Sequence, residues 1–184
     1  MPDYRRWYVP GGTFFFTVVT ADRRPILCDE LARHCLRRAI ETIRVRRPIE
    51  IVAFVLLPDH FRAVWTPPQG DSDYATRLRR IKVEFTGAYL INGGSEAPLS
   101  ESRQQKHERG VWQRRYWEHT VRDEDDLKRC VDYIHWNPRK HGYVLNVRDW
   151  QWSSFHRYVA LGEYTRDWGA NDPVPGYDDP EWGE

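Results

Sequence analysis

The sequence predicts an α+β fold of the ferredoxin-like type, with its elements in the order β-α-β-β-α-β. Short runs of β-branched and aromatic residues alternate with longer stretches whose apolar residues recur at helical spacing. That order predicts an antiparallel sheet with helices on one face, followed by a further helix toward the C-terminus. The 184 residues suffice for one domain with a core. We expect this domain to span residues 1–162, with an irregular acidic tail at 163–184.

Each element in the first half of the chain has its own signal. Residues 13–20 (TFFFTVVT) favour a strand because they are aromatic and β-branched. Asp29 can cap a helix that runs to about residue 47, with its apolar side chains in one stripe. Residues 49–57 form a nearly unbroken apolar run, typical of a buried strand, and a Pro-Asp turn leads into a partner strand at 60–66.

The second half completes the pattern. Residues 74–91 predict a helix. Residues 92–110 predict a loop that we expect to be the most mobile segment, because it is polar and contains several helix-breaking residues. A fourth strand is expected at 111–121. Asp123 can cap a third helix, which we expect to end at Asn137 because Pro138 follows. A short helix is expected near residues 153–161.

Charge is distributed unevenly although the net charge is only +1. Residues 163–184 hold seven acidic residues and one basic residue, which leaves 27 basic and 20 acidic residues in the preceding 162. A basic body is typical of proteins that bind a polyanion, and the alternative is a solvated surface with an acidic end. Three cysteines without paired spacing, no signal-peptide pattern and no membrane-length apolar run indicate a cytoplasmic protein that does not span a membrane.

Two segments carry side chains suited to chemistry. Along the strand at 60–66, His60 and Arg62 share one face, and Phe61, Ala63 and Trp65 share the other. If the helices cover the aromatic face, His60 and Arg62 point to the exposed face. Alternatively, His60 is a lone histidine beside a turn that has a structural role or is merely solvated.

On the third helix, Tyr133 and Asn137 are four residues apart and therefore lie on one side, at the rim of an apolar stripe that includes Cys130 and Ile134. We expect both to be half-exposed and able to reach a common point. The alternative is a tyrosine that packs its ring and exposes its hydroxyl, with Asn137 simply ending the helix.

Together these segments resemble a known family. The pairing of LPDHF (57–61) with YIHWNPRKHG (133–142) resembles the REP-associated tyrosine transposases, which are single-tyrosine transposases with a His-hydrophobic-His (HUH) metal motif. Further similar blocks follow in order, and the resemblance covers about residues 1–169. These blocks are the start at 5–13, IK and FT at 81–86, WQRRYWEH at 112–119 and WSSF at 152–155.

The resemblance implies a mechanism and a partner. The Tyr133 hydroxyl would attack a phosphodiester of single-stranded or hairpin DNA at palindromic repeats, leaving a 5′-phosphotyrosine link and a free 3′-OH. A Mg²⁺ or Mn²⁺ ion would polarise the phosphate. By match, His60 is the first metal ligand and Asn137 the ligand from the helix. The resemblance also favours a monomer over a dimer.

The chain departs from the family at position 62, where Arg62 stands in place of the second histidine of the motif. A guanidinium has no acceptor and keeps its charge, so it cannot bind a cation. Three interpretations stay open. The protein binds repeat hairpins with cleavage weakened or lost; or Arg62 clamps the scissile phosphate and partly replaces the metal; or His135 or His141 completes the site. His135 lies on the opposite flank of its helix, which counts against it.

Basic and aromatic side chains in four segments are candidates for DNA contacts. Alternatively, each basic side chain is simply solvated and each aromatic side chain belongs to the core. For the whole chain, the remaining alternative is an unrelated RNA-binding protein of the ferredoxin-like fold. The candidates are Arg62, Arg77, Arg79, Arg80, Lys82, Arg114, Arg115, Tyr116, Trp117, Arg139, Lys140 and His141.

Overall fold

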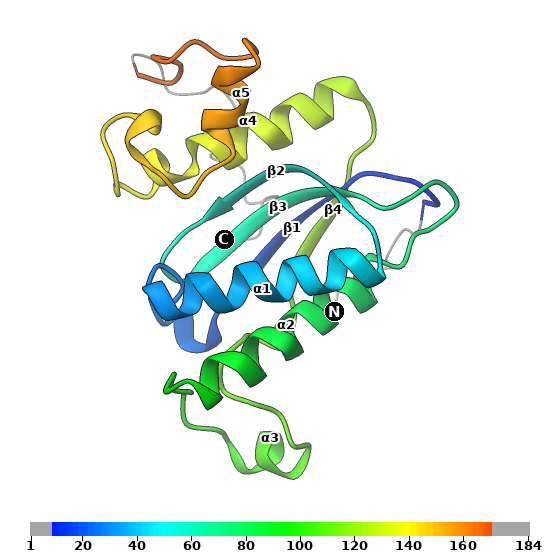
Figure 1. The fold of residues 1–184 in the computed structure, drawn as a ribbon, viewed down its shortest axis with the longest axis vertical. Helices are drawn as coiled ribbons and strands as arrows, with labels where there is room; N and C mark the ends of the chain where they lie inside the picture. Colours follow the sequence, from blue (N-terminus) through cyan, green and yellow to red (C-terminus); the bar gives the residue numbers. More distant parts are fainter. Residues whose placement is uncertain (1–8, 171–184) are drawn as a thin grey trace, which may run out of the picture.

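A four-stranded antiparallel sheet forms the centre of the protein, seen in a computed structural model that describes residues 9–170. Its strand order is β2-β3-β1-β4, which is the ferredoxin-like order and confirms the predicted α+β class (Figure 1). The tail predicted at 163–184 lies largely outside the described residues. The strands are β1 (Phe14–Val19), β2 (Glu50–Leu56), β3 (His60–Thr66) and β4 (Trp117–Thr120).

Helices α1 (Glu30–Arg46) and α2 (Tyr74–Ile91) cover one face of the sheet, within a residue of their predicted bounds. The Asp73 side chain caps α2 by accepting a hydrogen bond from the Thr76 amide at 3.1 Å. The two helices bury the large apolar residues of this face, which forms the main core. Its sheet residues include Phe14, Phe16, Val18, Phe61, Ala63 and Trp65.

Helix α4 (Glu124–Lys140) covers the opposite face, on the other side of the sheet from α1 and α2 (Figure 1). Its apolar stripe, with Cys130, Val131 and Ile134, packs against sheet residues that include Phe15 and Val64. The expectation that this face is exposed was therefore wrong. The stripe of α4 is apolar enough to need burial, and the second face of the sheet supplies the surface that buries it.

Two predicted boundaries were also wrong. Helix α4 continues through Pro138 to Lys140. Pro138 removes only one hydrogen bond from the last turn. The amides of His141 and Gly142 still donate to the carbonyl oxygens of Asn137 and Arg139. Strand β4 is shorter than residues 111–121, since the segment before it forms only an isolated bridge, from Trp112 to Thr20 just after β1.

Short helical segments join these elements. The long connection between α2 and β4 contains a single short helix, α3 (Glu101–Gln105), and η1 (Ala21–Arg23) follows β1. After α4 come η2 (Val147–Asp149) and α5 (Phe155–Ala160), the latter close to the predicted position. In the part of the chain that the structure describes, every helix is too short or too polar to cross a membrane.

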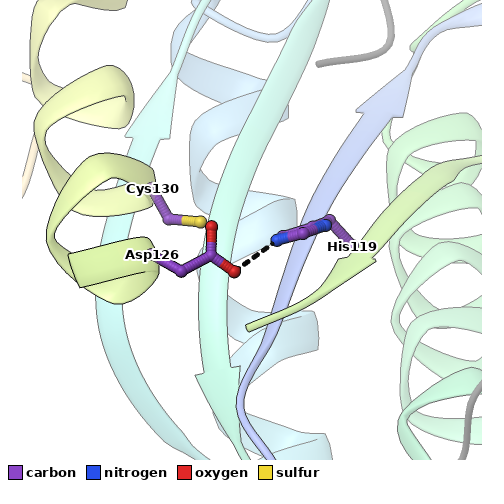
Figure 2. A group of neighbouring side chains, drawn as sticks. All are labelled: His119, Asp126 and Cys130. Atoms are coloured by element: carbon purple, nitrogen blue, oxygen red, sulfur yellow. Dashed lines mark hydrogen bonds and ion pairs between the residues drawn. The ribbon is translucent and has the colours of Figure 1, made fainter. Parts of the chain in front are cut away.

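A charged cluster fixes the start of α4 to β4. Asp126 on α4 accepts a hydrogen bond from His119 Nε2 on β4 at 2.8 Å (Figure 2). It also accepts one from the Arg122 amide at 2.9 Å and pairs with Arg129. Burial alone would raise the pKa of the Asp126 carboxyl, but the hydrogen bonds from Arg122 and His119 outweigh it and hold that pKa at about 2. The charged carboxylate therefore stabilises the folded state.

We expect Asp126→Asn to lower the free energy of unfolding by about 2 kcal/mol at neutral pH. The folded pKa lies below the unfolded value near 3.9, so the contribution is complete above about pH 4 and is lost as the pH falls toward 2. Urea unfolding of both proteins at stepped pH should show the difference shrinking across that window.

The matched control is Glu41→Gln, which removes the exposed ion pair of Glu41 with Arg37 on α1. It should change the free energy of unfolding by less than about 0.5 kcal/mol. A loss in the control as large as that of Asp126→Asn, or a difference that does not depend on pH, would contradict the role given to Asp126.

Candidate active site

The packing of α4 on the sheet brings Tyr133 and Asn137 over His60 and Arg62 of β3. All four side chains are buried, and Tyr133 is 0% exposed. The expectation that Tyr133 and Asn137 are half-exposed was therefore wrong. Because α4 lies flat on the sheet, even the rim of its apolar stripe is covered, and the Tyr133 ring lies 6.2 Å from the ring of Phe15 on β1.

His60 is held as one tautomer by its neighbour in sequence. Its Nδ1 lies 2.7 Å from Asp59 Oδ1, and Asp59 in turn pairs with Arg23 at 3.1 Å. Burial, together with the charge of Arg62, lowers the pKa of His60 below its ordinary value. Although burial alone would raise it, the pKa of Asp59 is held at about 2 by the hydrogen bond from His60 and by Arg23. His60 is therefore a neutral ring that donates from Nδ1 and offers the Nε2 lone pair to the site.

The Arg62 guanidinium lies between the two expected metal ligands. Its Nε is 3.4 Å from His60 Nε2 and 3.2 Å from Asn137 Oδ1, and its Nη1 donates to Thr17 Oγ1 at 2.9 Å. Thr17 is the partner of Arg62 in the register of β1 and β3. Arg62 is only 1% exposed, so these bonds satisfy a charge that has been removed from water.

Two cations flank the ring of Tyr133. The guanidinium carbon of Arg62 lies 4.9 Å from the ring centroid, and Lys140 Nζ lies 5.0 Å from it on the last turn of α4. Lys140 Nζ is also 3.4 Å from the phenol oxygen. Positive charge is therefore placed where negative charge develops when the phenol is the attacking or leaving group.

The two other histidines named as candidates occupy different places. His135 faces α5, where its Nε2 lies 2.8 Å from Ser154 Oγ and its ring contacts Tyr158. Burial and the charge of Arg157 lower the pKa of His135 to about 3. His141 is exposed, and its ring lies 5.3 Å from that of His60. His135 is thus excluded from the site by position, and His141 is at its edge.

The residues at this site do not fit a hard divalent cation. Mg²⁺ and Mn²⁺ prefer several oxygen donors, and carboxylates above all. Here the donor atoms are one imidazole nitrogen and one amide oxygen, and both face the Nε–H of a permanent cation. Asp59 is close in sequence, but its carboxylate is engaged by the far nitrogen of His60 and by Arg23.

A second group of potential metal ligands comprises His119, Asp126 and Cys130, the cluster that fixes α4 (Figure 2). Arg122, Arg129 and His119 already occupy the carboxylate oxygens of Asp126. Burial also raises the pKa of the Cys130 thiol far above its ordinary value, so the thiolate that would bind a metal is disfavoured. This group is an ion-pair cluster that positions the tyrosine helix.

Three of the residues predicted to contact DNA also pack within the protein. Arg77 is buried, pairs with Asp71 at 2.6 Å and donates to the backbone oxygens of Arg47 and Pro48, so it ties α2 to the end of α1. Trp117 packs its ring edge-on against Phe15. Tyr116 is half-buried and packs against Phe16.

The remaining basic candidates fall on two sides of the sheet. Arg139 and Lys140 lie half-buried at the end of α4, where Lys140 contacts Tyr133. Arg79, Lys82 and Arg114 line a groove of about 770 Å³ between α2 and the segment at 103–116, with Arg103 and Arg109. Arg80 and Arg115 are exposed. Burial and the charge of Arg103 lower the pKa of Lys82 to about 8, and its Nζ donates to the Gln113 backbone oxygen.

Sequence reasoning missed two parts of this arrangement. The Arg62–Thr17 hydrogen bond depends on the register of β1 with β3, and the Asp59–Arg23 pair depends on the path of η1. The alternation of Phe14, Phe16 and Val18 with Phe15 and Thr17 was the available signal for the first, since it places Thr17 on the face of Arg62. For the second pair the sequence offers no local signal.

Comparison with known proteins places the chain in a family. No protein-family model matches it. A REP-associated tyrosine transposase of Escherichia coli (strain K12) is 42% identical over 171 residues, covering 93% of each chain. A Haemophilus influenzae protein named for the same family is 41% identical over 172 residues, covering 93% of this chain and 95% of the relative.

A solved structure agrees with these relatives. It shows the REP-associated tyrosine transposase bound to a REP hairpin, and it superposes with a TM-score of 0.75 at 40% identity, covering 96% of this chain and 97% of that one. Identity above 40% over nearly the whole length, together with the shared fold, shows that this chain belongs to the REP-associated tyrosine transposases.

Proposed function

We propose that this chain nicks and rejoins single-stranded DNA beside palindromic repeat hairpins, as a monomer, through a covalent phosphotyrosine at Tyr133. The observation that carries the proposal is the contact of the Tyr133 side chain with positive charge from the buried Arg62 and the half-buried Lys140. Family membership supports the reaction class, and the solved relative bound to a REP hairpin supports the DNA structure that is recognised.

The chemistry follows from the groups around the phenol. Attack by the Tyr133 oxygen forms an O–P bond and breaks the bond from phosphorus to the 3′ oxygen, which leaves as a 3′-OH. The phosphotyrosine ester keeps the energy of the original linkage, so attack by a 3′-OH can rejoin a strand. Lys140, 3.4 Å from the phenol oxygen, stabilises the phenolate that leaves in the rejoining step. Since Tyr133 is fully buried, DNA reaches it only after the covering groups have moved.

The basic groove on the α2 side is the surface that best suits the DNA backbone. Glu108 is the one acidic residue in a lining that includes Arg79, Lys82, Arg103, Arg109 and Arg114. Trp112 and Tyr116 also line it. The basic side chains suit phosphates, and Tyr116, the half-buried aromatic of the two, suits an adjoining unpaired base.

A neighbouring hollow extends this groove toward η1. It shares Arg103, Glu108 and Arg114 with the groove and reaches Arg23, the partner of Asp59 beside His60. Among the described residues other than glycine, only Asp22, Arg23 and His107 have positive φ, and each lines one of the two hollows. Backbone held in such conformations is often part of a binding surface. We propose that a DNA strand passes from the groove over this hollow toward Asp59, which pairs with Arg23.

The test of the reaction uses a hairpin with a single-stranded flank that carries a fluorophore at its 3′ end. Incubation in EDTA, and separately with Mg²⁺ or Mn²⁺, should yield a labelled protein band on a denaturing gel, because the fragment with the 5′ phosphate stays on the enzyme. Tyr133→Phe should abolish the band and leave hairpin binding intact.

Tyr143→Phe is the control, because Tyr143 is an exposed tyrosine near the same end of α4. It should form the adduct like the natural protein. An adduct that survives in Tyr133→Phe refutes the assignment of the nucleophile. Hairpin binding without any adduct, in all conditions, would show a binding protein that does not cut.

For the groove, we expect Arg79→Ala with Arg114→Ala to weaken hairpin binding about tenfold and to lower the slope of log affinity against log salt by about 1.5, the loss of two phosphate contacts. Fluorescence anisotropy from low to moderate salt measures both. Arg37→Ala, which removes an exposed arginine on α1, should leave affinity and slope unchanged. Equal losses in the two proteins would point to overall charge and would remove the groove from the proposal.

A further inference from the structure

The most unusual feature of the site is that a side chain occupies the position at which the expected metal ligands converge. The Nε–H of Arg62 points to both His60 Nε2, at 3.4 Å, and Asn137 Oδ1, at 3.2 Å. His60 donates from its other nitrogen to Asp59, which leaves the Nε2 lone pair facing the guanidinium. Both acceptors are thus oriented as they would be toward a cation.

Asn137 supplies the second acceptor at this position. Its side chain is fully buried, and its Oδ1 accepts the hydrogen bond of the Arg62 Nε–H at 3.2 Å. Because the amide is closed off from water, the guanidinium provides the hydrogen-bond donor that its oxygen needs.

The charge at this position is permanent and fixed in place. A guanidinium stays protonated at any pH the protein meets, and it offers no lone pair to a metal. The Thr17 hydroxyl holds Nη1 at 2.9 Å, and the Tyr133 ring lies against the guanidinium carbon at 4.9 Å. A divalent ion bound to His60 and Asn137 would have to displace this group or lie in contact with a like charge.

We infer that Arg62 takes the place of the divalent cation in this chain, so that strand transfer by Tyr133 needs no metal. The inference rests on the proposed function, since it concerns the same reaction. The Tyr133 oxygen bonds to phosphorus, the bond to the 3′ oxygen breaks, and the phenolic proton is released while the departing oxygen is protonated. The guanidinium balances the negative charge of the phosphate during this exchange, as a preorganised group that does not have to be recruited.

The closing experiment compares the full natural chain with Arg62→His, which restores the second histidine of the family motif. Binding of Mn²⁺ is followed by the electron paramagnetic resonance signal of the free ion, and adduct formation is followed on the labelled hairpin in EDTA and in Mn²⁺. We expect the natural chain to bind no Mn²⁺ at this site and to form as much adduct in EDTA as in Mn²⁺. Arg62→His should bind one ion and form at least about tenfold less adduct in EDTA than in Mn²⁺.

Several results would overturn the inference. The first is one Mn²⁺ bound by the natural chain and lost in His60→Ala or His141→Ala. The second is a natural adduct that disappears in EDTA. The third is an adduct that Arg62→His forms and the natural chain does not. Arg62 would then only block the site. If neither protein forms an adduct although both bind the hairpin, the proposed strand transfer itself fails, and the inference falls with it.

Arg62→Lys keeps the result interpretable if Arg62→His does not fold, which circular dichroism would show. Lysine retains the positive charge but not the planar group that reaches His60, Asn137 and Thr17 together. We expect this variant to form less adduct than the natural chain, with no gain from Mn²⁺. Restoration of the adduct by Mn²⁺ in Arg62→Lys would contradict the replacement of the metal by charge.

Discussion

The contact between α4 and the second face of the sheet is the constraint on which the rest of the site depends. Cys130, Val131 and Ile134 bury themselves against this face, and the helix has no other apolar side to offer. Once that stripe is fixed, helical geometry leaves no freedom for Tyr133 and Asn137, which must lie over the strand that carries His60. The Asp126 cluster sets the position of the helix along its own axis, because it joins the first turn of α4 to β4.

The same contact explains how the charged side chain of Arg62 can lie buried between the sheet and α4. A guanidinium without partners would be very costly in this interior, where water does not reach it. Arg62 instead donates to groups on β1, β3 and α4, so its hydrogen bonds join the three elements that form the site. Removing the hydrogen-bond partners of a buried charge strongly destabilises a protein. The stability of the α4 packing is therefore coupled to the chemistry at Tyr133.

Local sequence patterns were sufficient for the elements but not for their relative placement. The stripes and caps of α1 and α2 predicted their bounds within a residue, because these signals are contained in the elements themselves. The face that α4 covers, and with it the burial of Tyr133, depends on a contact between distant segments that periodicity does not encode. The order of strands was predictable from the order of elements, whereas the Arg62–Thr17 pair required the strand register.

For the site, the family resemblance supplied the grouping of Tyr133, Asn137 and His60, and the structure brings these residues together around Arg62. The substitution at position 62 was visible in the sequence, but its consequence was not. Among the three interpretations it left open, His135 is now excluded by its packing against α5, and the position of the guanidinium favours a substitute charge. Of the basic residues, Arg77 could not be told from its surface neighbours until its buried ion pair was seen.

The most direct measurement of the central claim is a crystal structure of the full chain grown with Mn²⁺, with anomalous diffraction recorded at the manganese absorption edge. The account predicts guanidinium density between His60 Nε2 and Asn137 Oδ1 and no anomalous peak there. An anomalous peak bonded to those two atoms, with Arg62 turned out of the site, would contradict it.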